Sequence, residues 1–156
     1  MTYEKIDRLI SITREKNKLL QDMLSLTKKQ KEAIKKDAHD NLATCLEEKD
    51  RIIKQIDQLD RSFLEFFSEI KREHQIDSID QLDTNLYPNL KELKEVVKEV
   101  TSTLLAISLL DEENSKSIKE KLESTKAELT RIKNGQKAYK GYKYKFSESF
   151  LLDEKK

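Results

Sequence analysis

Apolar residues recur at intervals of three and four along most of this 156-residue chain. This spacing places them on one face of a helix and predicts long amphipathic helices. The first helix is expected from about residue 3 to 36, the second from about 38 to 73 and the third from about 88 to 133. In the second helix the pattern resembles coiled-coil heptads, with one polar break at Lys49.

The expected helix ends carry recognisable signals. Thr2 is expected to cap the first helix and Asp37 the second, because such side chains accept hydrogen bonds from free backbone N–H groups. Residues 74–89 interrupt the helical pattern and are expected to hold one short helical turn. Pro88 is expected at or near the start of the third helix, and Asn134-Gly135 is a strong signal for its end.

These signals together predict an all-α fold. The turn near residues 37–40 is tight, so the first two helices should fold back on each other. We therefore expect an antiparallel, coiled-coil-like bundle of three long helices, with a short connecting helix and a flexible C-terminal tail. The expected division is a helical bundle at residues 1–135 and a basic, aromatic tail at residues 136–156.

The tail differs in composition from the rest of the chain. It has six Lys and three acidic residues, and it contains half of the ten Tyr and Phe residues of the protein. Such side chains give a large contact area at small entropic cost, which favours binding of another protein. The alternative is that the tail folds back over the bundle. The tail aromatics are Tyr139, Tyr142, Tyr144, Phe146 and Phe150.

Composition narrows the function classes. With only two Gly and one Pro, the chain is poor in the residues that turns and sheets require. Its net charge is only +1, which argues against a nucleic-acid-binding protein. The apolar runs are too short to cross a bilayer, and a lone cysteine indicates a reducing compartment, so we expect a cytoplasmic protein without membrane insertion.

The chain shows no constellation typical of catalysis. His39 and His74 each lie at a predicted helix boundary, without a second candidate ligand at metal-binding spacing. Cys45 falls on the apolar stripe of the second helix, where a small core residue is expected. The two glycines cannot form a phosphate-binding loop. We therefore expect no enzyme activity, no cofactor and no metal site.

The third helix contains the candidate binding surface. Its leucine-rich face could exceed what two neighbouring helices cover and so accept an amphipathic helix of a partner; the alternative is that it closes the bundle. Asn114 lies on the same stripe and could fix register or present its amide to a partner. We favour the alternative that a bend turns Asn114 outward. Together with the tail aromatics, the candidate residues are Leu104, Ile107, Asn114, Ile118 and Leu122.

Three segments resemble the FlgN-type flagellar export chaperones. The segment from Leu42 to Asp60 is similar to one helix of that family. Leu110-Asp-Glu-Glu-Asn-Ser-Lys-Ser-Ile118 is similar to its third-helix signature, although Ser117 replaces a second Asn. The end of the chain, Ala138-Tyr-Lys-Gly-Tyr142 followed by Ser149 to Lys156, is similar to the tails of its Gram-positive members.

This resemblance implies a cytoplasmic, non-enzymatic chaperone of type III protein export in bacterial flagellum biogenesis. Its implied partners are the hook-associated proteins of the hook–filament junction and components of the flagellar export gate. Such a chaperone covers the aggregation-prone terminal helices of its client without ATP, by mass action. The alternative function is a structural coiled-coil adaptor that self-associates through the second helix, and a homodimer is compatible with either function.

Overall fold

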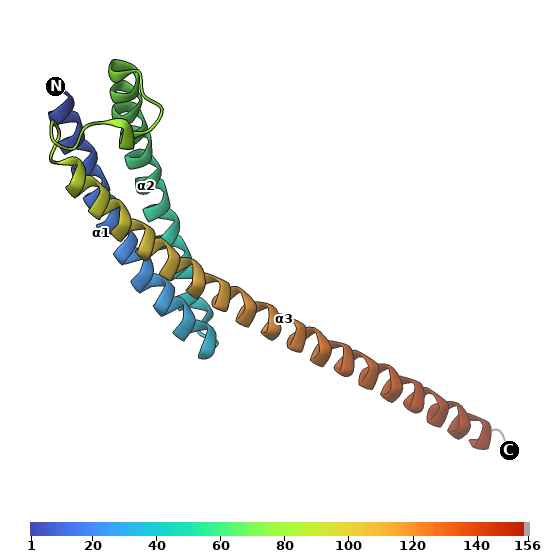
Figure 1. The fold of residues 1–156 in the computed structure, drawn as a ribbon. Coiled ribbons are helices and arrows are strands. Elements are labelled where there is room, and N and C mark those ends of the chain that lie inside the picture. Colours follow the sequence, from blue (N-terminus) through green and yellow to red (C-terminus); the bar gives the residue numbers. More distant parts are fainter. Residues whose placement is uncertain (155–156) are drawn as a thin grey trace. The chain divides into compact units, whose positions relative to one another are not determined.

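The computed structural model describes the backbone of residues 1–154 and the side chains of residues 1–140. It contains helices α1 (Thr2–Lys35), α2 (His39–His74) and α3 (Leu90–Glu154), and the single 3₁₀ turn η1 (Ile79–Gln81) (Figure 1). No strand occurs between residues 1 and 154. The prediction of an all-α chain with a short helical turn before the third helix is therefore confirmed.

Two compact units divide the chain, the first comprising Met1–Asn114 and the second beginning at Ser115. Within the first unit, α1 and α2 are antiparallel neighbours (Figure 1). Lys5 near the start of α1 pairs with Glu73 near the end of α2, and Lys16 further along α1 pairs with Asp60. Residue numbers therefore rise along α1 as they fall along α2, as the tight turn between them predicts.

The first part of α3 runs parallel to α1. Asn17 accepts a hydrogen bond from the Thr103 hydroxyl at 3.2 Å, and Thr27 further along α1 contacts Asn114. The side-chain amide of Asn89, immediately before α3, donates to the Tyr3 carbonyl at 3.0 Å. The loop after α2 thus returns the chain to the beginning of α1, and the three helices of this unit follow an up-down-up order.

Two apolar clusters hold the first unit together, and each contains residues from α1, α2 and α3. Removing one Leu, Ile or Val side chain from water contributes about 1.5–3 kcal/mol. Three partly buried aromatic side chains near the end of α2 pack against the first cluster: Phe63, Phe66 and Phe67. The buried residues of the first cluster are Ile6, Leu9, Ile10, Ile70, Leu82, Leu90, Leu93 and Val96, and those of the second are Leu20, Met23, Ile56, Val100 and Ile107.

The expected helix caps are wrong. Met1 is the N-cap of α1, and Thr2 lies inside the helix, where its hydroxyl contacts the His74 ring. Asp37 adopts a left-handed backbone conformation, with φ of 53°, and Ala38 is the N-cap of α2. Neither helix has a side-chain capping hydrogen bond.

The third helix does not end at Asn134-Gly135 but continues to Glu154. No glycine in the described chain has a positive φ, so Gly135 does not adopt the left-handed conformation that terminates helices. The predicted end of the third helix near residue 133 is therefore wrong, because the backbone of residues 136–154 is helical. The flexibility expected of the tail stays a prediction. A glycine inside a helix costs only about 1 kcal/mol relative to alanine, which good helix formers on either side can offset.

Candidate functional site

The predicted binding stripe of α3 is only partly exposed in the first unit. Leu104 is exposed, whereas Ile107, one turn further, retains only 6% of its accessible surface. Ile107 belongs to the second apolar cluster, together with Met23 of α1 and Ile56 of α2. In this conformation its side chain packs in the core of the first unit and offers little surface to a partner.

Asn114 is buried as well, with an exposed fraction of 2%. Its side-chain amide donates a hydrogen bond to the backbone carbonyl of Thr27 in α1, at 3.1 Å. Thr27 is itself fully buried, and its hydroxyl donates to the Met23 carbonyl at 2.7 Å. The expectation that a bend turns Asn114 outward is therefore wrong. The side chain faces α1 inside the first unit, where its N–H group has a hydrogen-bond acceptor.

A polar layer lies about one helical turn from the contact between Asn114 and Thr27, since Asp111 precedes Asn114 by three residues and Gln30 follows Thr27 by three. The Lys49 ammonium donates to the Gln30 side-chain oxygen at 3.0 Å and to the Asp111 carboxylate at 2.7 Å. Lys49 and Gln30 are both buried. At the polar break predicted at Lys49, an ion pair therefore joins α2 to α3, and a hydrogen bond to Gln30 joins α2 to α1. Since unpaired charge is expensive to bury, this layer requires Asp111 to face Lys49.

The second unit presents a row of exposed apolar side chains on α3. Their positions follow intervals of three, four and seven, which places them on one face of the helix. Their exposed fractions lie between 39% and 66%, and no residue of this unit from Ser115 to Lys140 is buried. We call this row the α3 stripe; it consists of Ile118, Leu122, Leu129, Ile132 and Tyr139.

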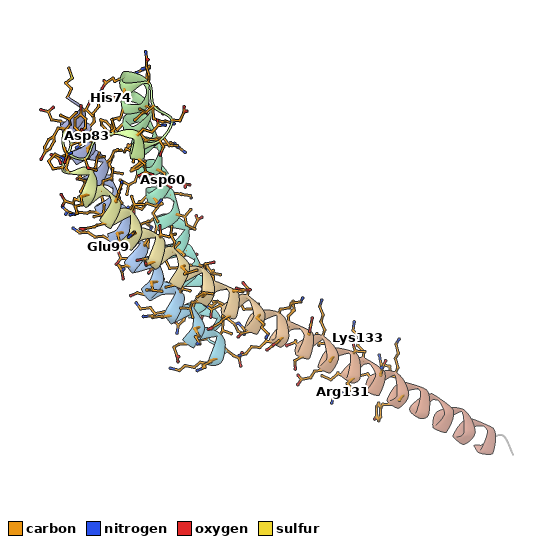
Figure 2. All side chains as sticks on the ribbon, in the orientation of Figure 1. Asp60, His74, Asp83, Glu99, Arg131 and Lys133 are labelled. Carbon is orange, nitrogen blue, oxygen red and sulfur yellow. The ribbon has the colours of Figure 1, made fainter. Side chains whose placement is uncertain are left out.

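The surroundings of the α3 stripe are basic. The segment from residue 115 to 140 contains eight Lys or Arg and three Glu, for a net charge of +5. Arg131 and Lys133 are among these side chains (Figure 2). An apolar row bordered by cations fits an amphipathic partner with acidic flanks, since the cations steer its approach and exclude basic competitors.

Four of the predicted tail residues have side chains outside the described residues. These are Tyr142, Tyr144, Phe146 and Phe150, whose backbone belongs to α3. Tyr139 is the tail aromatic whose side chain is described, and it is exposed. The role assigned to the other four in binding a partner stays a prediction.

Among the exposed apolar residues that sequence reasoning missed, two lie on α3 in the first unit. Leu105 and Leu109, spaced by four on α3, are 60% and 55% exposed. They lie off the stripe that the heptad pattern selects, so periodicity alone did not identify them. The signal was available in the crowded segment from Leu104 to Leu110, which holds more apolar side chains than one buried stripe of a helix requires.

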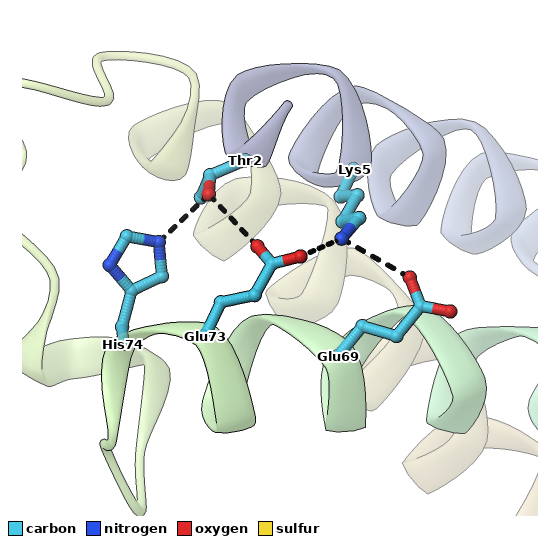
Figure 3. A network of polar contacts seen from close by, with 5 residues as sticks. All are labelled: Thr2, Lys5, Glu69, Glu73 and His74. Carbon is cyan, nitrogen blue, oxygen red and sulfur yellow. Dashed lines mark hydrogen bonds and ion pairs between the residues drawn. The ribbon is translucent and has the colours of Figure 1, made fainter.

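The free ends of α1 and α2 are joined by a polar network (Figure 3). Lys5 pairs with Glu73 and, at 3.3 Å, with Glu69. The Thr2 hydroxyl lies 2.8 Å from His74 Nε2. The hydrogen bond between Lys5 and Glu73 raises the pKa of the Lys5 ammonium and lowers the pKa of the Glu73 carboxyl. We name this network the terminal clasp; it consists of Thr2, Lys5, Glu69, Glu73 and His74.

Neither a metal site nor a membrane-spanning helix is found among the described residues. Within that part of the chain, no three His, Cys, Asp or Glu side chains converge to hold a metal ion. No helix there has a stretch long and apolar enough to span a bilayer. The described surface does offer exposed apolar area on α3, which fits the binding of another polypeptide.

Comparison with protein-family models identifies a match over nearly the whole chain. The sequence model of the family described as FlgN protein matches residues 1–145. The matched segment includes all of the first unit, the polar layer near Asn114 and the α3 stripe. No significant match was found among curated proteins or among solved structures.

Proposed function

Since the chain belongs to the FlgN family of flagellar export chaperones, we propose that it binds the hook-associated proteins of the hook–filament junction. In this proposal it acts in the cytoplasm and delivers its clients to the flagellar type III export apparatus. The family match supports the general role of a flagellar export chaperone. The α3 stripe is the observation that supports a helical segment of the client as the bound element.

The α3 stripe has the properties of a helix-docking surface. Its five members lie along one face of α3 and are all exposed. An amphipathic helix of the client, read at positions i, i+3, i+4 and i+7, would cover them. Each large apolar side chain removed from water would contribute up to about 1.5–3 kcal/mol to binding, before the entropic costs of association.

The predicted site residues then divide into two roles. Ile107 and Asn114 stabilise the first unit and do not contact the client. Ile118, Leu122 and Tyr139 belong to the contact surface. A contact role for the other four tail aromatics stays part of the proposal. Leu104 of the first unit is exposed and is a further candidate contact, as are Leu105 and Leu109 on a neighbouring face of α3.

Calorimetry with a purified junction protein tests the proposal. Leu122→Asp combined with Leu129→Asp should weaken binding at least about tenfold, because about 1.4 kcal/mol corresponds to that factor. The matched control is Ser124→Asp with Ala127→Asp, which adds the same charge on the opposite face of the same helix. Equal loss of affinity in both double variants, with helicity retained, would refute the α3 stripe as the docking surface.

The second candidate function is a self-associating coiled-coil adaptor. One observation favours it: Leu46, Ile53 and Leu64 of α2 are exposed, and their spacings of seven and eleven place them on one helix face. Light scattering separates the two functions. An adaptor stays a dimer or larger form on dilution through the micromolar range, whereas an export chaperone of the proposed kind needs its client to form a stable complex.

A further inference from the structure

The α3 stripe follows a strict seven-residue repeat. From Ile118 to Tyr139 its positions are spaced by four and three residues in alternation, and the exposed polar residues Thr125 and Gln136 occupy the two positions that its five members leave open. In heptads lettered a to g, Leu122 takes position a and Ile118 position d. A straight α-helix drifts by about 20° per heptad from such a repeat, so its persistence predicts a supercoil with another helix. The pattern therefore predicts a long partner helix with heptads of its own.

Charge around the α3 stripe is one-sided. Positions e and b lie on one side of a stripe formed by positions a and d, and positions g and c lie on the other side. Between residues 115 and 140 the first side holds six Lys and one Glu, for a net charge of +5. The second side holds Lys121, Arg131 and Glu128, for a net charge of +1. The lysines at position e border the stripe directly, and we call them the lysine row: Lys119, Lys126, Lys133 and Lys140.

The lysine row carries charge that its own helix does not neutralise. All four side chains are exposed, and among the described residues none of them forms an ion pair. On that side of the helix the carboxylate is Glu123, which lies between Lys119 and Lys126 in the sequence and can neutralise only one of these two charges. Glu120 is at position f, opposite the stripe, and Glu128 is on the second side.

A second copy of this chain is a poor partner for the α3 stripe. In a parallel pair, position g of one helix faces position e of the other, so Lys121 of one copy would face Lys126 of the other. Only Glu128 would meet an opposite charge, at Lys133. In an antiparallel pair the e positions face each other, so the two lysine rows would meet. Since like charges across an interface act against wrong partners, the lysine row disfavours self-association through this segment.

We infer that the α3 stripe forms a two-stranded coiled coil with an acidic, heptad-bearing helix of its client, and that the lysine row selects this helix by charge. The inference rests on the proposed function, because it names the class of helix that the stripe binds. The apolar positions of the client helix pack against the stripe. Carboxylates bordering those positions pair with the lysine row, because charges at such positions set partner choice in coiled coils.

A helix fits this surface better than a lipid membrane does. Basic amphipathic helices also bind membrane surfaces, where a wide apolar face enters the bilayer. The α3 stripe has two positions per heptad, which is the narrower seam of a coiled coil, and Thr125 and Gln136 interrupt it. Lipid headgroups surround an embedded helix on both sides, so they do not account for lysines that border one side of the stripe.

The test uses the full-length protein and two fluorescein-labelled peptides of four heptads, with fluorescence anisotropy as the measurement. Both peptides have Leu at positions a and d; one has Glu at positions e and g, and the other has Lys there. The unsubstituted protein should bind the Glu peptide at least about tenfold more tightly than the Lys peptide. The combined variant Lys119→Glu, Lys126→Glu and Lys133→Glu should reverse this preference, and tight binding of the Lys peptide would show that the variant is folded. Equal affinity of the unsubstituted protein for the two peptides would overturn the inference.

A second pair of variants separates the lysine row from net charge. Changing the same three lysines to Gln should lower affinity for the Glu peptide at least about tenfold. The control removes as much positive charge at exposed positions c and f, away from the stripe: Ser124→Glu, Ala127→Glu and Asn134→Glu. At an ionic strength of about 0.15 M these charges are largely screened, so affinity should stay within about twofold. An equal loss in the two variants would show that only net charge matters and would overturn the inference.

Measurements with a junction protein distinguish failure of the inference from failure of the proposed function. If a junction protein loses affinity in Leu122→Asp with Leu129→Asp but not in the lysine-row variants, the proposed function stands and the inference fails. If the Glu peptide binds through the lysine row but no junction protein binds, the inference stands and the proposed function fails. Self-association that Leu122→Asp with Leu129→Asp abolishes would overturn the inference. So would phosphatidylglycerol vesicles that bind as tightly as the Glu peptide through the same lysines.

Discussion

A single side-chain amide links α3 to α1 in the first unit. Asn114 donates to the backbone carbonyl of Thr27, and both residues are almost completely buried. A buried amide that finds a partner adds little net stability, but one that loses its partner costs about 1–3 kcal/mol. Sliding α3 by one residue along α1 would impose this cost, so Asn114 favours one register of the two helices.

We expect Asn114→Ala to lower the free energy of unfolding by about 1–3 kcal/mol, because it removes the donor to Thr27 and leaves a small cavity. Urea unfolding followed by circular dichroism measures this change. Ser115→Ala, at the neighbouring exposed position, should stay within about 0.5 kcal/mol of the unsubstituted protein. Equal stability of the two variants would show that the amide is dispensable.

The residue that ends α2 offers a stabilising substitution. Gln75 has a left-handed backbone, with φ of 51° and ψ of 46°, at a position where glycine is usual. Gln75→Gly should therefore raise the free energy of unfolding by about 0.5–1 kcal/mol. The other left-handed position is Asp37, where Asp→Gly should gain less because aspartate tolerates this conformation better. A lower denaturation midpoint for Gln75→Gly would contradict the strain argument.

At the scale of helices, local sequence signals correctly predicted that three long helices are present. They did not predict where α3 ends or that Asn114 is buried. The heptads of α2 and the interruption before Pro88 gave the helices and their approximate starts. The end of α3 was missed because Asn134-Gly135 is only a local signal, and its neighbours continue the helix. The burial of Asn114 was missed because it depends on the Thr27 carbonyl, which no periodicity within α3 can reveal.

The contact between the ends of α1 and α2 should depend on pH. Lys5 holds the pKa of the Glu73 carboxyl below its ordinary value of 4.5. The stabilisation of the fold by the ionised Glu73 is therefore fully present above pH 4.5 and is lost as pH falls through the lowered pKa. Glu73 holds the pKa of Lys5 above 10.5, so the same pairing is present below pH 10.5 and is lost as pH rises through the raised pKa. The Lys5–Glu73 pair of the terminal clasp is therefore ionic between these limits.

Glu73→Gln should lower the urea midpoint at pH 7 and should have a shrinking effect as pH falls well below 4.5, where the native carboxyl is itself protonated. Urea titrations across this range measure the difference from the unsubstituted protein. The control is Glu65→Gln, at an exposed α2 position for which no ion pair is found among the described residues. A difference for Glu73→Gln that does not change with pH would exclude its ionic origin.

At the scale of the whole molecule, folding and the proposed binding depend on different parts of the chain. Every buried residue lies within Met1–Asn114, as far as side chains are described. The α3 stripe lies after Ser115 and has no buried residue beneath it up to Lys140. Removing the end of the chain should therefore affect client binding far more than stability, which allows the two to be measured separately.

We expect deletion of residues 136–156 to leave the unfolding free energy of the first unit within about 0.5 kcal/mol, because no residue of either apolar cluster is removed. The helical circular dichroism signal should fall only by the contribution of the deleted helical residues. Affinity for a junction protein should fall, since Tyr139 and the four further aromatics leave with the segment. Full-length protein with these five aromatics changed to Ser should show the same loss by calorimetry. Unchanged affinity in either variant would contradict a role of the tail in client binding. The proposed contact surface would then be limited to Ile118, Leu122, Leu129 and Ile132.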